Sequence, residues 1–265
     1  MTTGQTLRVK PRIWIGLVIW IGYIVLVFAI QKSTGIPYDT WGDSAGNLFL
    51  GAGVSLIVAT VLLALTTSLL GWWRPALFEA QRSHHKWPIF VPILVVVAVV
   101  MNLAGTDWGA YSGAFLGASL VLLLVGFTEE LVHRGLLLTA LRSRLSEVWV
   151  WLISSTLFAV MHFVNILLGS PVAGTVSQVG AAFLGGTAFY IVRRVTGSLV
   201  WAMVLHGVWD FSVFATGVGT AGSVTYVANV VYLLAGTLGL AVVWFVLRGP
   251  RDRKSPVGTS ADVPA

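Results

Sequence analysis

The sequence contains no cysteine, and this absence removes several kinds of chemistry at once. A chain without cysteine forms no disulfide, offers no thiolate to a metal and has no thiol nucleophile. Any metal must therefore be bound by histidine, aspartate or glutamate, and any nucleophile must be a hydroxyl group or an activated water.

Charged residues are also scarce. Only 10% of the 265 residues are Asp, Glu, Lys or Arg, whereas 57% are hydrophobic. Soluble domains carry about 25% charged residues, and the mean hydropathy here is +0.88. The composition therefore predicts an integral membrane protein, since too little polar surface is available to cover a soluble globule. The net charge of +6 comes from short basic groups between apolar runs, so we expect no nucleic acid as a partner.

Long apolar runs make up most of the chain as far as residue 247. They cover 13–30, 45–73, 87–106, 108–128, 148–192 and 195–247. The last two are each long enough for two spans, divided at 169–174 and 217–222, where small residues gather. Because one span takes about 20 residues, the sequence predicts an all-α bundle of about eight transmembrane helices.

The basic residues between these runs indicate the orientation. If the N-terminus is cytoplasmic, the inside segments contain Arg8, Lys10, Arg12, Arg74, Arg82, Lys86, Arg142, Arg144, Arg193, Arg194, Arg248, Arg251, Arg253 and Lys254. The outside segments then contain one basic residue, Lys32, together with Asp39, Asp43 and Asp107. An excess of lysine and arginine is typical of the cytoplasmic side of a membrane protein, so we predict that both termini are cytoplasmic. The compact chain shows no targeting signal, which favours a bacterial plasma membrane.

The sequence divides into one transmembrane domain and a short tail. Residues 1–247 form the domain, and its polar motifs lie within 108–214. Residues 248–265 are basic and then rich in serine, proline, glycine and alanine, without an apolar period. We expect this tail to be disordered and cytoplasmic.

A small set of ionisable residues lies in or near the spans. These are Glu129, Glu130, His133, Arg134, His162, His206 and Asp210. A charge at the middle of a bilayer costs about 2.5–3.5 kcal/mol, so such residues must face the bundle interior, a water-filled cavity or one another. They are the candidates for function, except His133, which we expect near the cytoplasmic interface.

Helical spacing sorts the acidic residues. Glu130 and Arg134 are four residues apart, so they share one helix face and can pair. Glu129 lies about 100° around the helix from Glu130, which leaves it free to hold a water as a general base. His206 and Asp210 are also four apart, so Asp210 is placed to orient the imidazole or to join it as a metal ligand.

Three short motifs, in this order, each on an apolar segment, resemble one family. They are E-E-x-x-x-R at 129–134, F-x-x-x-H at 158–162 and H-x-x-x-(N/D) at 206–210. Together they resemble the CPBP family of intramembrane metalloproteases (CAAX prenyl protease and bacteriocin-processing, also called Abi). The resemblance covers roughly residues 108–214. It implies an all-helical membrane endopeptidase with a cavity open toward the cytoplasm or the bilayer.

The resemblance also implies roles for the motif residues. Glu129 resembles the water-activating carboxylate, and His162 and His206 resemble the catalytic histidines. Glu130 and Asp210 complete the candidate catalytic set, with Arg134 in support. The prenyl-protease branch has asparagine at the position of Asp210, and asparagine can donate a hydrogen bond to an oxyanion where an ionised aspartate cannot.

The resemblance leaves the cofactor and the activity open. One possibility is a divalent metal, with Zn²⁺ on His162 and His206 as the first choice. The other is a metal-free mechanism that depends on glutamate. The expected partners are the lipid bilayer and a peptide or protein substrate, and no oligomeric state is indicated. The alternatives to a protease are a non-catalytic immunity or scaffold protein and, less favoured, a proton-coupled transporter.

Overall fold

The computed structural model describes residues 7–80 and 82–248. Within them, eight helical segments are long and apolar enough to cross a membrane. They are Ile13–Thr34, Ala45–Leu70, Trp87–Gly105, Gly113–Leu141, Glu147–Leu167, Val172–Thr196, Leu199–Thr216 and Val224–Leu247. The predicted all-α bundle is confirmed, and both long apolar runs divide where we expected. Of the predicted tail, residues 249–265 lie outside the described residues.

Several spans are built from more than one helical piece. The simple spans are α1 (Ile13–Thr34), α11 (Val172–Thr196), α12 (Leu199–Thr216) and α13 (Val224–Leu247). The second span joins α2 (Ala45–Leu48), the π-helical turn η2 (Phe49–Gly53) and α3 (Val54–Leu70), and the third is mainly α5 (Phe90–Gly105). The fourth joins α6 (Gly113–Ser119), α7 (Leu123–Glu130), the π-helical turn η6 (Leu131–Leu137) and α8 (Leu138–Leu141). The fifth joins α9 (Glu147–Val160) and α10 (Val164–Leu167), and the short helix α4 (Trp73–Leu77) precedes the third.

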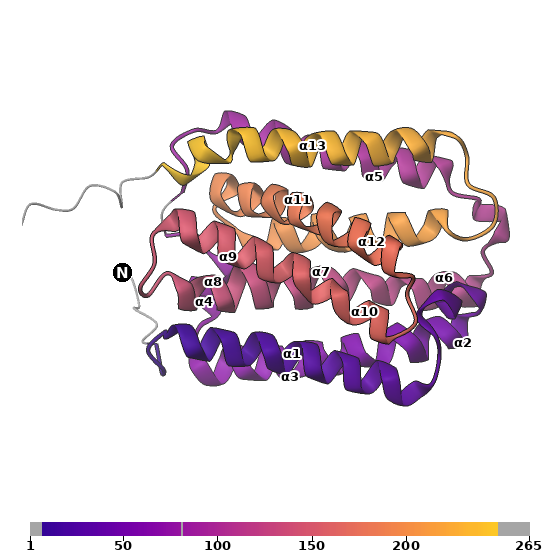
Figure 1. Cartoon of the computed structure of the whole chain (residues 1–265), viewed down its shortest axis with the longest axis horizontal. Helices are drawn as coiled ribbons and strands as arrows, with labels where there is room; N and C mark the ends of the chain where they lie inside the picture. Colours follow the sequence, from indigo (N-terminus) through magenta and orange to yellow (C-terminus); the bar gives the residue numbers. More distant parts are fainter. Residues whose placement is uncertain (1–6, 81, 249–265) are drawn as a thin grey trace, which may run out of the picture.

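The helices lie along the long axis of the molecule (Figure 1). In that view α1 and α3 form one side, α5 and α13 the opposite side, and α7, α9, α11 and α12 lie between them. The main helix pairs are α13 with α5, α12 with α7, and α11 with both α9 and α13. The beginning of α1 and the end of α13 lie at the same end of the bundle, as an even number of spans requires.

The two ends of the bundle differ in charge. One end, here called the basic end, carries the described residues Arg8, Lys10, Arg12, Arg74, Arg82, Lys86, Arg142, Arg144 and Arg248. The other, here called the acidic end, carries Asp39, Asp43 and Asp107 in the loops and one basic residue, Lys32. The charge asymmetry predicted from the sequence therefore corresponds to two real ends of the molecule.

The fourth span continues beyond the point where its apolar run was expected to end. The helix passes through Glu129 and Glu130 and reaches Leu141 by way of η6. His133 is consequently buried, with no exposed surface, and the expectation that it lies near an interface is wrong. Its Nε2 accepts a hydrogen bond from the indole N–H of Trp20 on α1 at 3.0 Å, and its Nδ1 bonds the carbonyl oxygen of Glu129 at 2.7 Å.

Two arginines that we assigned to a cytoplasmic loop lie within a helix. Arg193 and Arg194 belong to the last turns of α11, and they are 0% and 2% exposed. Their burial could not be predicted from the sequence, because their partners, Glu79 and Glu147, come from distant segments.

Candidate active site

The site is built where α7 and α12 cross at very short range. A Cβ atom at Gly126 would collide with the backbone of Met203 and Gly207, and one at Gly207 would collide with the carbonyl oxygen of Leu123. Glycine at both positions therefore allows the two backbones to touch, as small residues do at other crossings of membrane helices. This contact brings the two glutamates at the end of α7 beside His206 on α12.

Glu130 lies in the centre of this contact. Its Oε1 accepts a hydrogen bond from the Arg134 guanidinium at 2.9 Å, and neither side chain has exposed surface. The same oxygen lies 3.0 Å from Nδ1 of His206. The predicted pair of Glu130 with Arg134 is confirmed, and Glu130 also orients the imidazole, a task that we had considered for Asp210.

The second nitrogen of the His206 ring, Nε2, points toward two further carboxylates. This nitrogen lies 3.5 Å from Oδ2 of Asp210 and 3.9 Å from Oε2 of Glu129. The Glu129 side chain is 15% exposed, and its Oε2 has no hydrogen-bond partner among the described residues. Glu129 therefore has the free carboxylate oxygen that the sequence analysis expected of it.

Phe158, from the second motif, lies between the charged and the histidine side chains. The Arg134 guanidinium carbon is 4.0 Å from the centre of its ring. The imidazoles of His162 and His206 meet the ring edge-on, with centroids 5.4 and 5.5 Å away. Such contacts use the negative face and positive edge of the ring. The phenylalanine of the motif thus contacts Arg134 and both histidines.

His162 is held by its own helix. Its Nδ1 lies 3.0 Å from the carbonyl oxygen of Phe158 and 3.2 Å from that of Ala159, which leaves Nε2 for the cavity. A hydrogen bond from Nδ1–H to a carbonyl oxygen fixes the tautomer in which Nε2 is unprotonated. The histidine of the second motif is therefore presented in a defined orientation.

Two aromatic residues of the site were missed by the sequence analysis. Phe189 on α11 stacks on His206, with ring centroids 4.6 Å apart and planes inclined by 21°. Tyr23 on α1 lines the cavity, and its hydroxyl lies 3.3 Å from Oγ1 of Thr128. Phenylalanine is common in apolar runs, so the sequence does not distinguish Phe189 as a site residue. The hydroxyl of Tyr23 is a polar group in the middle of an apolar span, and it could have indicated a site residue.

The acids and histidines face a cavity of about 650 Å³. The candidate residues on its wall are Glu129, His162, His206 and Asp210. Glu130 and Arg134 lie behind them and do not line it. The volume is within the range of about 300–1,000 Å³ typical of ligand pockets, so the cavity can admit a short segment of peptide.

The residues do not fit a metal site in this arrangement. Within the described chain, no three His, Asp or Glu side chains are grouped so that they could hold a metal ion. His206 uses Nδ1 for Glu130, and only its Nε2 and that of His162 remain as nitrogen donors. A catalytic zinc needs three protein ligands and an open position. The predicted Zn²⁺ on His162 and His206 therefore remains without a complete ligand set.

Comparison with known proteins identifies the region that contains the motifs. Residues 111–212 match the family model of the type II CAAX prenyl endopeptidase Rce1-like proteins. No curated protein matches the chain. The matched segment includes all three motifs, and with them all six candidate residues: Glu129, Glu130, Arg134, His162, His206 and Asp210. The segment that carries the candidate site is therefore similar to the Rce1-like family of type II CAAX prenyl endopeptidases.

Proposed function

We propose that the protein is an intramembrane endopeptidase in which Glu129 activates the hydrolytic water. The family supports a membrane endopeptidase in general. The observation that carries the finer proposal is the approach of Glu129 Oε2 to His206 Nε2, 3.9 Å apart on the wall of a cavity of about 650 Å³. A carboxylate with a free oxygen beside an oriented imidazole can provide a general base and a hydrogen-bond donor at one point.

In the proposed reaction, Glu129 takes a proton from water while the water oxygen adds to the carbonyl carbon of the scissile peptide. The oxyanion that forms is stabilised by a hydrogen bond from Nε2–H of His206 in its imidazolium form, whose Nδ1–H donates to Glu130 and whose ring stacks on Phe189. Glu129 then returns its proton to the leaving amine, and the carbon–nitrogen bond breaks. The products are a carboxylic acid and an amine.

We propose that His162 and Asp210 bind and orient the substrate at this centre. His162 faces the cavity with Nε2, and Asp210 is placed to accept a hydrogen bond from a peptide N–H. Since no group of three ligands is present among the described residues, the proposal includes no metal in any step. We expect dialysis against a chelator to leave proteolysis unchanged, and a loss that zinc restores would contradict this.

The decisive experiment compares the native protein with Glu129→Gln. The amide keeps the size of the side chain but cannot take up a proton, so we expect a folded, inserted protein without proteolysis. The measurement is a survey of new protein N-termini in membrane fractions of cells that express each form. Asp39→Asn is the matched control, because Asp39 is exposed and does not line the cavity.

The alternatives give other results in the same experiment. A non-catalytic immunity or scaffold protein would yield identical N-termini in all three strains and would keep its phenotype in Glu129→Gln. A proton-coupled transporter would show substrate flux in proteoliposomes and no cleavage. The proposal requires N-termini that are present with the native protein and Asp39→Asn and absent with Glu129→Gln.

A further inference from the structure

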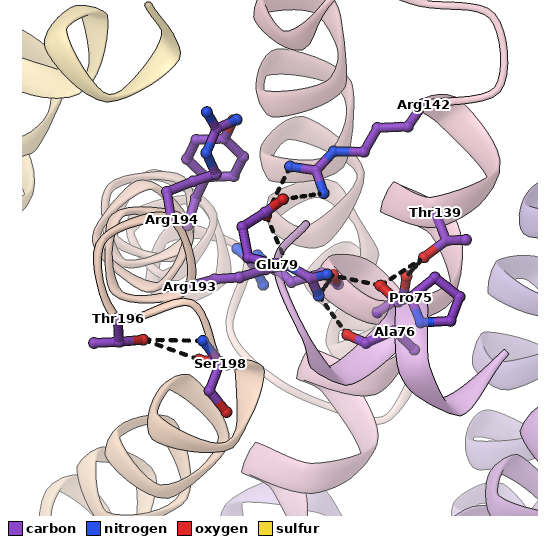
Figure 2. A network of polar contacts seen from close by, with 12 residues as sticks. Pro75, Ala76, Glu79, Thr139, Arg142, Arg193, Arg194, Thr196 and Ser198 are labelled. Carbon is purple, nitrogen blue, oxygen red and sulfur yellow. Dashed lines mark hydrogen bonds and ion pairs between the residues drawn. The ribbon is translucent and has the colours of Figure 1, made fainter. Parts of the chain in front are cut away.

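The basic end of the bundle is closed by a buried network of ion pairs (Figure 2). Glu79, from the loop after the second span, lies 2.8 Å from Nη2 of Arg142 and 3.3 Å from Nε of Arg193. Glu147 at the start of α9 lies 2.5 Å from Arg142 and 2.6 Å from Arg194. The Glu79 pairs tie the loop after the second span to the end of the fourth span and to α11, and the Glu147 pairs join α9 to the same network.

Arg193 strengthens this closure by binding main-chain oxygens. Its guanidinium, which has no exposed surface, donates to the carbonyl oxygens of Pro75, Ala76 and Arg134. The hydroxyl of Thr139 donates to the same Pro75 oxygen at 3.3 Å. These bonds hold α4 against the fourth span, and Figure 2 shows Pro75 and Ala76 beside Arg193 and Thr139.

The cavity extends toward the other end. Phe158, Phe189 and His206 line it near the middle of their spans. From there, its lining residues lie in the halves of the spans that approach the acidic end. The outermost of them include Tyr38 and Trp41, which belong to the loop that carries Asp39 and Asp43.

The part of the cavity toward the acidic end also carries polar side chains. Four amide side chains line it: Gln31, Asn165, Gln178 and Asn229. Asn165 donates to the Gln178 side-chain oxygen at 3.0 Å, and Asn229 is exposed. An intramembrane polar lining is tolerated where it faces water. Water for hydrolysis therefore has a polar path to Glu129 from the acidic end.

Two expectations from the sequence conflict at this point. The family resemblance implies a cavity open to the cytoplasm or the bilayer, whereas the basic residues predict that the closed, basic end is cytoplasmic. Arginine and lysine in short loops determine the orientation of most membrane proteins. The acidic end, whose one described lysine or arginine is Lys32 in the last turn of α1, is then the extracytoplasmic end.

We propose that substrate reaches this site from the extracytoplasmic side of the membrane. The inference rests on the proposed endopeptidase function and specifies its substrate class. The scissile bond belongs to an extracytoplasmic or membrane-embedded segment of a membrane-anchored or exported protein. A prenylated tail that remains in the cytosol would meet the closed end and is not a substrate.

The absence of cysteine permits a clean test, because any single cysteine introduced is the only thiol in the chain. The cavity variant is Ser177→Cys, an exposed residue of α11 on the cavity wall. The end variants are Ser223→Cys, exposed at the acidic end, and Ser146→Cys, exposed at the basic end. None of these serines belongs to the proposed catalytic machinery.

Each variant is treated in intact cells with a charged maleimide that does not cross the membrane, and again after permeabilisation. We expect Ser177→Cys and Ser223→Cys to be labelled equally in both, and Ser146→Cys to be labelled only after permeabilisation. Labelling of Ser146→Cys alone in intact cells would overturn the inference. So would a Ser177→Cys that reacts only after permeabilisation or in neither condition.

Labelling does not depend on catalysis, so the two proposals can fail separately. The same three cysteines are also placed in the Glu129→Gln background, where we expect unchanged labelling. Unchanged labelling with no cleavage in any strain would contradict the proposed function alone. Cleavage sites that disappear with Glu129→Gln but map to cytosolic segments would contradict the proposed access alone.

Discussion

At the scale of single residues, the imidazole of His206 connects most of the candidate site. Glu130 binds its Nδ1 at 3.0 Å, Phe189 stacks on its face, and Nε2 points toward Glu129 and Asp210. Arg134 holds Glu130 in turn. Glu130 therefore acts on the proposed chemistry through His206, as a positioning residue, and not by touching the substrate.

This role can be separated from simple stability with two variants. Glu130→Leu leaves the buried Arg134 without its counter-charge, and breaking a buried pair in this way costs about 3–5 kcal/mol in the free energy of unfolding. The double variant Glu130→Leu/Arg134→Met removes both charges and should recover most of that stability. We expect both variants to be inactive, because His206 has lost its acceptor.

The measurements are chemical unfolding of the purified protein in detergent and cleavage in membranes. If the double variant is as stable as the native protein and still active, Glu130 does not position His206. If it is stable and inactive, the positioning role is supported independently of folding.

Some of these contacts could be predicted from the sequence and others could not. The pairing of Glu130 with Arg134 follows from their spacing of four residues on one helix. The second contact of Glu130, with His206, depends on the relative height of α7 and α12, which no local spacing determines. Phe189 was missed for the same reason, since its stacking on His206 depends on how α11 packs.

At the scale of helices, the crossing of α7 and α12 determines whether the acids and the histidine meet. The π-helical turn η6 follows directly after Glu130 and contains His133 and Arg134. Such turns are frequent at functional sites. The sequence predicted a span here but not the π-helical turn, because it contains no proline or other residue that marks one.

The crossing is tested by adding a single methyl group. In Gly207→Ala, the new Cβ would collide with the carbonyl oxygen of Leu123. Overpacking of this kind costs about 1–3 kcal/mol, and the separation of the helices should move His206 away from Glu130. We expect lower stability and little or no cleavage.

The matched control is Gly117→Ala in the same span as Glu129, because a Cβ there has open space around it. This variant should match the native protein in unfolding and in proteolysis. Equal activity of Gly207→Ala and Gly117→Ala would show that the close crossing is not needed for the site.

The buried ion pairs of Glu79 should make the free energy of unfolding depend on pH in the acid range. Burial raises the pKa of the Glu79 carboxyl, but the guanidiniums of Arg142 and Arg193 outweigh burial and hold it below its ordinary value of 4.5. Stability from this carboxylate is therefore complete above pH 4.5 and is lost as the pH falls through the lower pKa of the folded protein.

We expect Glu79→Gln to be less stable than the native protein at neutral pH, with a smaller further loss on acidification. The measurement is the free energy of unfolding in detergent between neutral and acid pH. Asp39→Asn, at an exposed loop position, is the control and should keep the native acid dependence. An identical acid dependence of Glu79→Gln and the native protein would contradict this account.

At the scale of the whole molecule, ion pairs close the basic end of the bundle, and the cavity lies in the half toward the acidic end. The number of spans and their boundaries could be predicted from apolar runs, and the distribution of basic residues from the loops. The half of the bundle that contains the cavity could not be predicted, because it depends on how the spans pack together and on the buried contacts of Glu79, Arg142 and Arg193. Those contacts join segments that are far apart in the sequence.

The orientation of these ends is the remaining prediction. Alkaline phosphatase folds only outside the cytoplasm, so its activity reports the side on which a fusion point lies. We expect an active enzyme when it is fused after Gly219, in the loop between α12 and α13, because that loop belongs to the acidic end. Alkaline phosphatase fused after Arg248, at the basic end, should be inactive. Green fluorescent protein fused at the same point should fluoresce. The reverse pattern would place the basic end outside, contrary to the positive-inside rule, and the cavity would then open to the cytoplasm.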